Sequence, residues 1–324
     1  MIKSLNEEKR IAVAIKSALD AVSAFNGEVI LADSCSSDRT IEIAKQYPIR
    51  IVQLEDPTER CCGIGPQLGF QHSVGEYVYI LDGDMEILPG FMDVAVTFLD
   101  ANPEFAGVGG LLLEMNTESL EYISRVERAS SHVQLGEVDR LDSGGLYRRK
   151  AIKQVGYFSN RNLHSYEEYD LGVRLRAAGW KLQRLDVQSI RHYGHDVEPY
   201  SLLLKRWNSG YICGLGEMVR AAHGERHLGL LITEVRELRV YFATLCWLLI
   251  CFYLMTLTVI NVQYLTYLTS TLLLPEVVMA VKKKSVAKGF YSLVSWVVNL
   301  LGIIRGVCRN QKSCLVPIKT KEIK

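Results

Sequence analysis

Two aspartates separated by a single glycine, Asp82 and Asp84, are the residues of this chain with the clearest chemical potential. They follow an apolar run at residues 76–81, whose aromatic and β-branched side chains predict a buried strand. The pair would then lie at the carboxyl end of a strand, where open α/β sheets bind ligands. Two such carboxylates can hold a hard divalent cation that keeps open positions for phosphate oxygens. The alternative is a plain turn, because Asp-Gly is a common turn dipeptide.

The sequence around this pair alternates between helical and extended patterns. A helix capped by Asn6 ends near residue 27, and strands at 28–32 and 49–54 flank a helix at 40–47. This alternation implies a mostly parallel, Rossmann-like sheet with flanking helices, so the predicted fold class is α/β. The same patterns predict further helices at 67–74, 89–99, 117–133, 167–178 and 199–222, and strands at 106–114 and 187–193.

The last third of the chain differs in composition from the rest. From Arg239 onward it is apolar, has Lys and Arg at its breaks and almost lacks acids, which is a membrane signature. We therefore predict a globular domain at residues 1–225 and a membrane-anchoring region at residues 226–324.

Residues 241–260 and 264–281 are each about long enough to cross a bilayer, and the short link between them predicts a helical hairpin. Lysines at 282–284 follow the second span, so the positive-inside rule places both ends of the hairpin in the cytosol. Residues 286–304 are apolar but contain Lys288 and several polar residues, which favours a helix lying in the membrane interface. A third span is the alternative.

Composition excludes some classes of function. The chain has 37 Lys and Arg against 36 Asp and Glu, and a net charge of +1 gives no reason to expect nucleic acid as a partner. The eight cysteines lack metal-ligand spacing, which favours reduced packing residues and a cytosolic setting. A dinucleotide-binding dehydrogenase is disfavoured, because no G-x-G-x-x-G follows a predicted strand.

Five short motifs occur in the order typical of a known family. They are residues 4–8 (SLNEE), 32–40 (ADSCSSDRT), 82–84 (DGD), 167–171 (EEYDL) with 174–180 (RLRAAGW), and 205–207 (KRW). From residue 4 to about residue 216, the chain resembles the family 2 glycosyltransferases, whose catalytic domain has the GT-A fold. The resemblance implies a hexosyltransferase that takes its sugar from a nucleotide-diphosphate sugar and uses a divalent metal, Mg or Mn, as cofactor.

The resemblance also implies a role for each motif. Glu168 stands where the family has its catalytic base, usually an aspartate, and Asp170 is the second candidate for that base. The metal ligands would be Asp84 and Asp82, with His192 as a third candidate. The residues expected to bind the nucleotide-sugar are Ser4, Glu7, Asp33, Arg60, Asp82, Arg206 and Trp207.

Several of these residues have a structural alternative. Asp33 could cap the turn after its strand, and Asp170 could pair with Arg174 one helical turn away. Arg60 could be a solvated charge, and His192 could be a packing or hydrogen-bonding group.

The chemistry implied by the resemblance is a displacement at the anomeric carbon of the donor sugar. A divalent cation would neutralise the charge that develops on the departing diphosphate, and Arg206 could assist it. A carboxylate, assigned to Glu168, would deprotonate the acceptor hydroxyl on the opposite face, so the expected outcome is inversion.

The resemblance and the apolar helices together predict a multi-pass protein of the inner or plasma membrane, with its catalytic domain in the cytosol. The expected acceptor is a lipid-linked sugar or a growing polysaccharide, in bacterial cell-envelope or exopolysaccharide assembly. The rival functions are a polyprenyl-phosphate glycosyltransferase and a non-catalytic, nucleotide-sugar-binding scaffold subunit.

One departure from the family concerns folding. The family's first strand normally precedes the Asn-Glu-Glu loop, and only residues 1–3 could remain of it here. That strand is usually central, so its loss would leave unpaired backbone groups and exposed apolar surface. We therefore expect the N-terminal strand to be missing.

Overall fold

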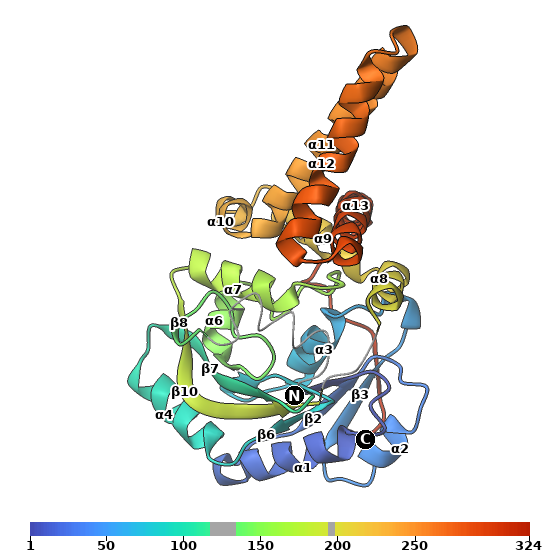
Figure 1. The fold of residues 1–324 in the computed structure, drawn as a ribbon. Helices are drawn as coiled ribbons and strands as arrows, with labels where there is room; N and C mark the ends of the chain where they lie inside the picture. The colour runs from blue at the N-terminus through green and yellow to red at the C-terminus, as the bar shows by residue number, and fades with distance from the viewer. Residues whose placement is uncertain (117–133, 194–197) are drawn as a thin grey trace. The chain divides into compact units, whose positions relative to one another are not determined.

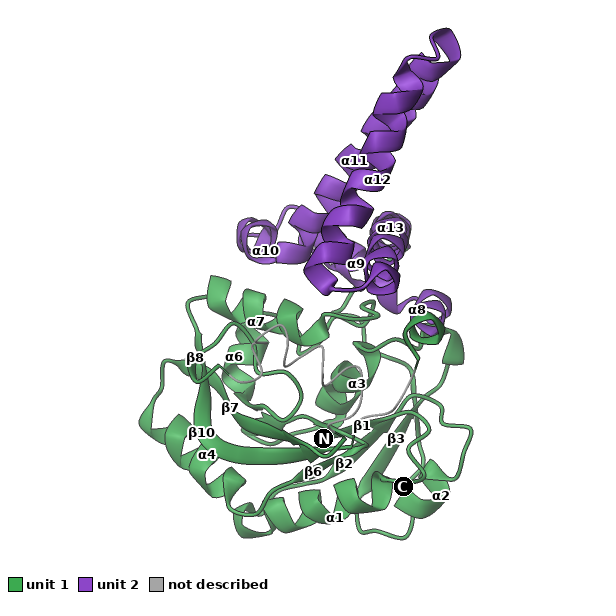
Figure 2. Cartoon of the chain, in the orientation of Figure 1, with its two compact units in different colours: residues 1–202, 310–324 green, residues 203–309 purple. Residues whose placement is uncertain are grey.

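The structure is a computed structural model that describes residues 1–116, 134–193 and 198–324 (Figure 1). The chain forms two compact units, which are residues 1–202 with 310–324, and residues 203–309 (Figure 2). These units divide at Leu202, and the C-terminal residues belong to the first of them, whereas the functional boundary near residue 225 stays a prediction. The helix predicted at 117–133 lies outside the described residues.

The strands of the first unit form two sheets, and Figure 1 labels some of their strands. Those of the first sheet are β1 Ile2–Ser4, β2 Ile30–Asp33, β3 Arg50–Leu54, β5 Leu81–Asp82 and β11 Thr320–Glu322. Those of the second are β4 Tyr77–Tyr79, β6 Met85–Ile87, β7 Phe105–Glu114, β8 Gly136–Glu137, β9 Leu146–Arg148 and β10 Lys181–His192. The first sheet has the order β11-β3-β2-β1-β5, in which β1, β2, β3 and β5 are parallel. The second has the order β4-β9-β7-β10-β6, with β8 paired to β10. This arrangement confirms the predicted α/β class. The sheets are mixed rather than mostly parallel, because β10 pairs parallel with β7 but the other pairings of the second sheet are antiparallel.

Helices cover both faces of the first sheet (Figure 1). Those of this unit are α1 Ile11–Val22, α2 Thr40–Ala44, α3 Ile64–His72, α4 Phe91–Ala101, α6 Arg149–Gln154 and α7 Glu167–Ala177. Because side chains alternate along a strand, neighbouring residues bury on opposite faces. Leu31 packs in the cluster of Ile11 and Ile15 from α1, whereas Ile30 packs in the cluster of Ile64 and Leu68 from α3.

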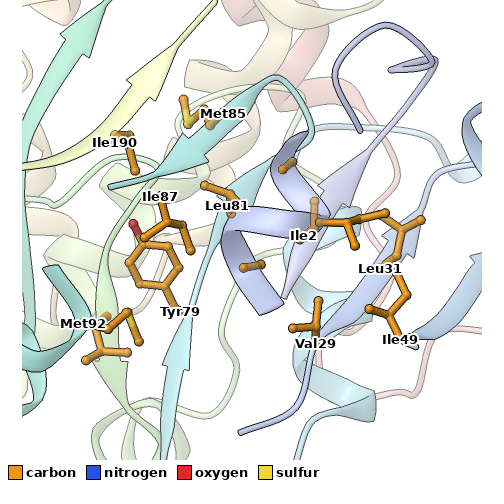
Figure 3. Packing of buried hydrophobic residues seen from close by; sticks show 14 of the residues in the cluster. Ile2, Val29, Leu31, Ile49, Tyr79, Leu81, Met85, Ile87, Met92 and Ile190 are labelled. Carbon is orange, nitrogen blue, oxygen red and sulfur yellow. The ribbon is translucent and has the colours of Figure 1, made fainter. Parts of the chain in front are cut away.

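The expectation that the first strand is missing is wrong. Residues 2–4 form β1, which lies between β2 and β5 with Ile2 in register with Leu31 and Leu81. Ile2 is 1% exposed, and Figure 3 shows it between these two residues. Three residues suffice because the strands on both sides supply hydrogen-bond partners and the apolar contacts that a central strand needs.

The predicted single helix at 199–222 is interrupted. The structure has α8 Pro199–Asn208, a 3₁₀ turn at Tyr211–Cys213 and α9 Gly214–Ala221. The break follows from Gly210, whose φ of +78° is a left-handed conformation that ends a helix.

The second unit contains the apolar helices. They are α11 Arg236–Ile260, α12 Tyr264–Lys283 and α13 Val286–Cys308, and the shorter α10 Leu228–Glu234 precedes them. In the part of the chain that the structure describes, these three helices are long and apolar enough to cross a membrane. The hairpin predicted from residues 241–260 and 264–281 thus corresponds to α11 and α12.

The C-terminal residues return to the first sheet. Strand β11 pairs antiparallel with β3, so that Thr320 lies opposite Leu54. Ile318, just before this strand, is 3% exposed and belongs to the same apolar cluster as Ile64 and Leu68. The tail therefore covers an edge of the sheet that would otherwise present unpaired backbone groups.

Candidate active site

Lys3 lies at the centre of the candidate active site, although the sequence analysis did not select it. Its ammonium is 3.2 Å from Asp82, 3.4 Å from Glu167 and 3.4 Å from Glu168. The lysine is on β1, Asp82 is opposite it on β5, and the glutamates begin α7. The pairing of β1 with β5 therefore brings the predicted metal motif and the predicted base motif to one place.

The charges of this cluster shift one another's ionisation. Burial by itself favours the neutral amine of Lys3, but Asp82, Glu168 and Glu167 raise its pKa well above the ordinary value. Burial, reinforced by Glu168, raises the pKa of Glu167 to about 7. Burial also raises the pKa of Asp82, although Lys3 opposes that shift. A lysine that stays charged therefore compensates carboxylates that would otherwise repel one another.

Ser143 joins the cluster from the glycine-containing bend that follows it. Its hydroxyl donates to Asp82 at 2.9 Å and lies 3.4 Å from Glu168. The amide of Gly144 donates to the carbonyl of Ile80 at 2.9 Å, which holds the bend beside the strand that carries Asp82. Gly144 has a φ of +89°, a conformation that glycine adopts without steric cost. Asp82 and Glu168 thus share a hydroxyl as well as an ammonium group.

Asp170, the second candidate for the base, is buried and paired with Arg174. Its side chain is 1% exposed and forms an ion pair with Arg174 at 2.8 Å. Arg174 also donates to the carbonyl oxygens of Tyr157 at 2.8 Å and Phe158 at 3.2 Å. The pair therefore fastens α7 to the preceding segment, which is the structural alternative that the four-residue spacing predicted.

Asp84 faces His192. The Nε2 of His192 is 3.5 Å from Asp84, and its Nδ1 is 2.6 Å from Glu114. Burial alone would lower the pKa of His192, but the bonds to Asp84 and Glu114 raise it to about 10. A protonated imidazole carries hydrogens on both nitrogens and has no lone pair for a metal. In this arrangement His192 is a hydrogen-bonding partner of Asp84, and its role as a third metal ligand stays a prediction.

The carboxylates fit a cation that arrives with its substrate. No three His, Cys, Asp or Glu side chains among residues 1–116, 134–193 and 198–324 are grouped to hold a metal ion. Asp82 is engaged by Lys3 and Ser143, and Asp84 is engaged by His192. Mg²⁺ is often bound by one or two carboxylates together with substrate phosphates, and Asp84 suits that arrangement.

Asp33 is fully buried, and its predicted contact with the nucleotide stays a prediction. It accepts hydrogen bonds from the hydroxyl of Ser4 at 3.2 Å, the amide of Ser36 at 2.8 Å and the side chain of Gln53 at 2.9 Å. Ser4 is buried with it. Asp33 and Ser4 therefore stabilise the loop after β2. This is the capping role expected as the alternative for Asp33.

Glu7 lies beside Asp82 and Asp84 and borders an open cavity. A Cβ atom at Gly83 would lie 2.8 Å from Cγ of Glu7, so the glycine allows this approach. Burial and the charges of Asp84 and Asp82 raise the pKa of Glu7 to about 7. The adjoining cavity has a volume of about 460 Å³, and Tyr193 is among its lining residues. A ligand there would contact Glu7, whose charge interacts with the acidic pair.

The remaining predicted residues are dispersed. Arg60 donates to the carbonyl of Cys35, in the loop that Asp33 shapes. Arg206 and Trp207 belong to the second unit, where Arg206 lies 5.0 Å from the ring centroid of Tyr211. Their contact with the donor remains a prediction.

Sequence reasoning missed Lys3, Ser143 and Glu114, and it named Glu167 only within a motif. The position of Lys3, directly before Ser4 at the end of the family's first strand, could have identified it. That strand, however, was expected to be missing. Glu114 had none, since only the pairing of β7 with β10 places it opposite His192.

Residues 1–156 match the sequence model described as Glycosyl transferase family 2. This part of the chain belongs to glycosyl transferase family 2. The match includes Lys3 and the acidic motif at residues 82–84. The chain also has relatives of known name.

Glucomannan 4-beta-mannosyltransferase 2 of Arabidopsis thaliana is 24% identical over 245 residues, which are 68% of this glycosyltransferase and 44% of the relative. The putative glycosyltransferase EpsE of Bacillus subtilis (strain 168) is 27% identical over 185 residues, 54% of this chain and 65% of EpsE. The chain thus spans less than half the length of the plant relative.

Solved structures share the fold of this glycosyltransferase. The crystal structure of S. aureus TarS 1-349 has a TM-score of 0.51 at 17% identity and covers 90% of this chain and 88% of its own. The complex of TarS 1-349 with UDP-GlcNAc has a TM-score of 0.50 at the same identity. These likenesses agree with the GT-A fold that the sequence predicted.

Proposed function

We propose that this glycosyltransferase moves a sugar from a nucleotide-diphosphate sugar to a hydroxyl group of a lipid-linked or glycan acceptor, with inversion at the anomeric carbon. The observation that carries the proposal is the convergence of Asp82, Glu167 and Glu168 on Lys3, from three separate stretches of the chain. The UDP-GlcNAc-bound relative supports a nucleotide-sugar donor, and the mannosyltransferase and EpsE relatives support polysaccharide synthesis.

Glu168 is the proposed base. Its side chain is 25% exposed, in contrast to the buried Asp170, so an acceptor hydroxyl can reach it. Lys3 and Ser143 hold its Oε1, which leaves Oε2 to accept a proton from the acceptor. A positioned carboxylate of this kind contributes about 10²–10⁴-fold to the rate of hydroxyl attack.

The donor's diphosphate would lie near Asp84. A divalent cation held there, together with diphosphate oxygens, would supply compensation for the charge of the leaving group. His192 would hold the Asp84 carboxylate in place from the side of Glu114, because it bonds to both acids. The cavity beside Glu7 would take part of the nucleotide.

The cellular setting is part of the proposal. The apolar helices would anchor the enzyme to the inner or plasma membrane, with the catalytic unit on the cytosolic side where nucleotide sugars are made. A membrane anchor favours an acceptor that is itself membrane-bound, such as a lipid-linked sugar.

Transfer by purified full-length protein tests the assignment. With a panel of labelled nucleotide sugars, Glu168→Gln should lower kcat by about 10²-fold or more. Asp84→Asn should weaken both donor binding and turnover. Glu137→Gln, an exposed glutamate on β8, is the matched control and should leave transfer unchanged. Wild-type rates from both active-site variants would contradict the proposed chemistry and favour a non-catalytic subunit.

Acceptor choice separates the remaining alternatives. Polyprenyl phosphate and a lipid-pyrophosphoryl sugar are offered in parallel, and the anomeric configuration of each product is read by NMR. An inverted product on the second acceptor is expected. A product on polyprenyl phosphate alone would identify the enzyme as a polyprenyl-phosphate glycosyltransferase.

A further inference from the structure

We propose that residues 203–309 cross the membrane twice, through α11 and α12, and that α13 lies in the membrane interface with its exposed apolar stripe against lipid. This membrane topology goes beyond the proposed sugar transfer. It rests on where the chain leaves and re-enters the first unit, and on how α13 packs within the second.

The two ends of residues 203–309 connect to the same folded unit. Strand β11 pairs with β3, and Arg50 on β3 contacts Glu322 on β11 at 2.7 Å. Residues 1–202 and 310–324 therefore form one folded unit and lie on one side of any membrane. The chain between them must return to the side that it left, so the number of complete crossings is even.

Three helices are long enough to make those crossings. At 1.5 Å per residue α11, α12 and α13 are about 37, 30 and 34 Å long, so each could span a hydrocarbon core of about 30 Å. The other helices of residues 203–309 are shorter than about ten residues and cannot span it. An even number means that at least one of the three long helices does not cross, and that two cross if the unit spans the membrane at all.

The packing of α13 identifies it as that helix. A Cβ atom at Gly306 would lie 2.1 Å from the carbonyl oxygen of Cys213, and one at Gly302 would lie 2.6 Å from that of Ile212. The end of α13 thus packs backbone to backbone on the 3₁₀ turn before α9. A helix too short to span cannot accompany α13 across a bilayer.

Charged contacts fix the same end of α13. Arg309 donates to the buried Glu217 of α9 at 2.9 Å, and Arg220 of α9 donates to the carbonyl of Val307 at 2.9 Å. These groups favour water or lipid headgroups over hydrocarbon.

The lysines between α12 and α13 select the crossing pair. Residues 282–284 are all lysine, and they would lie on the far side if α13 crossed together with either of the other helices. If α11 and α12 cross, the lysines remain on the side of the catalytic unit, as the positive-inside rule favours. Trp247 of α11 donates to the carbonyl of Thr271 of α12 at 2.9 Å, which joins the two as a hairpin.

The exposed apolar face of α13 therefore lies against the bilayer surface. Five apolar residues of α13 are between 41% and 70% exposed, while Gly289, Gly302 and Gly306 face protein. A helix with one face on protein and an apolar face uncovered is suited to lie at the boundary of headgroups and acyl chains. The exposed residues are Val286, Phe290, Leu301, Ile304 and Val307.

Labelling in sealed membrane vesicles tests the topology. Single cysteines are placed at Lys16 on α1, Val262 in the hairpin link and Gln311 after α13, in full-length protein without other cysteines. A membrane-impermeant maleimide should label Lys16→Cys and Gln311→Cys from one side and Val262→Cys from the other. Three crossings would group Gln311→Cys with Val262→Cys, and no crossing would expose all three on one side. Either result overturns the proposal.

A second measurement keeps the native cysteines, in case their replacement prevents folding. A protease-sensitive tag follows Lys324 in vesicles whose catalytic unit faces outward. Added protease should remove the tag without detergent. A tag that is protected until detergent opens the vesicles contradicts an even number of crossings.

Depth measurements test the placement of α13. Fluorophores at residues 290, 297 and 304, which share one helix face, should show equal quenching by lipid-borne quenchers at one shallow depth. Residues 267, 274 and 281 of α12 are the matched control and should differ in depth. A depth gradient along α13 like that along α12 would mean that α13 spans. Neither experiment needs sugar transfer, so the outcome is independent of the proposed function.

Discussion

Lys3 stands between the carboxylate of the predicted metal motif and the glutamates of the predicted base motif. Its amine reaches Asp82, Glu167 and Glu168 within 3.4 Å. Without its charge, three carboxylates would face one another in a partly buried site. We therefore regard Lys3 as a positioning residue for the reaction.

Replacement of this lysine should separate charge from shape. Lys3→Met should lower kcat by at least tenfold and destabilise the first unit by about 3–5 kcal/mol, because an interior ion cluster loses its compensating partner. Lys3→Arg keeps the charge and should recover part of both losses. Turnover and thermal unfolding of the two variants are measured together. If Lys3→Met behaves like wild type, the lysine has no such role.

At the scale of elements, the C-terminal tail completes the first sheet. Its anchor is Ile318, which packs with residues of β2, β3 and α3. The tail is also held by polar contacts, since Lys312 lies 2.6 Å from Glu59 and Arg161 donates to the carbonyl of Val316 at 2.9 Å. The C-terminal tail thus protects the edge of the first sheet and supplies part of its hydrophobic core.

Truncation of the anchor should be costly. Ile318→Ala should lower the free energy of unfolding by about 2–5 kcal/mol, since it opens a cavity in a closed cluster. Leu315→Ala is the control from the same tail, because Leu315 is 73% exposed and its loss should change the free energy by less than about 0.5 kcal/mol. Hydrogen exchange of the β3 amides measures the effect of both substitutions on stability. Equal effects would show that the tail does not contribute to the core.

Low pH should weaken the attachment of the C-terminal tail to the rest of the first unit. Burial opposes ionisation of Glu59, but the bonds from Lys312 and Arg161 outweigh it and hold its pKa below the ordinary value of 4.5. A carboxylate with a lowered folded-state pKa stabilises above its unfolded pKa, and that contribution is lost as pH falls through the folded value. Proteolysis of the tail should therefore rise below about pH 4.5. Glu59→Gln should be cleaved readily at neutral pH and should respond less to acid, and an unchanged pH response would refute the link.

At the scale of the whole molecule, donor binding should be visible as stability. A ligand that binds only the folded state at 100 times its Kd stabilises it by about 2.7 kcal/mol. Thermal unfolding of the full-length protein with UDP- and GDP-linked sugars, each with Mg²⁺ or Mn²⁺, should identify the donor by the largest rise in Tm. Removal of the metal with EDTA should reduce that rise if a cation joins the diphosphate to Asp84. Asp84→Asn should then show a small rise that EDTA does not change.

Much of this architecture was predictable from the sequence. The helical and extended patterns of residues 6–54 and the apolar hairpin are local, because spacing and composition over a few turns set them. The motif at residues 82–84 and Glu168 could likewise be found from short stretches. For the same reason the pairing of Asp170 with Arg174 was foreseen as an alternative, since the two are four residues apart.

What the tertiary structure alone decided are the contacts between distant residues. Lys3 and Glu168 are 165 residues apart in the sequence, and His192 and Glu114 are 78 apart. No local pattern could show that three residues at the start form a central strand, or that the tail joins β3. Such pairings form because strand edges and apolar faces must be covered somewhere in the fold, and the sequence near a residue does not say by which partner.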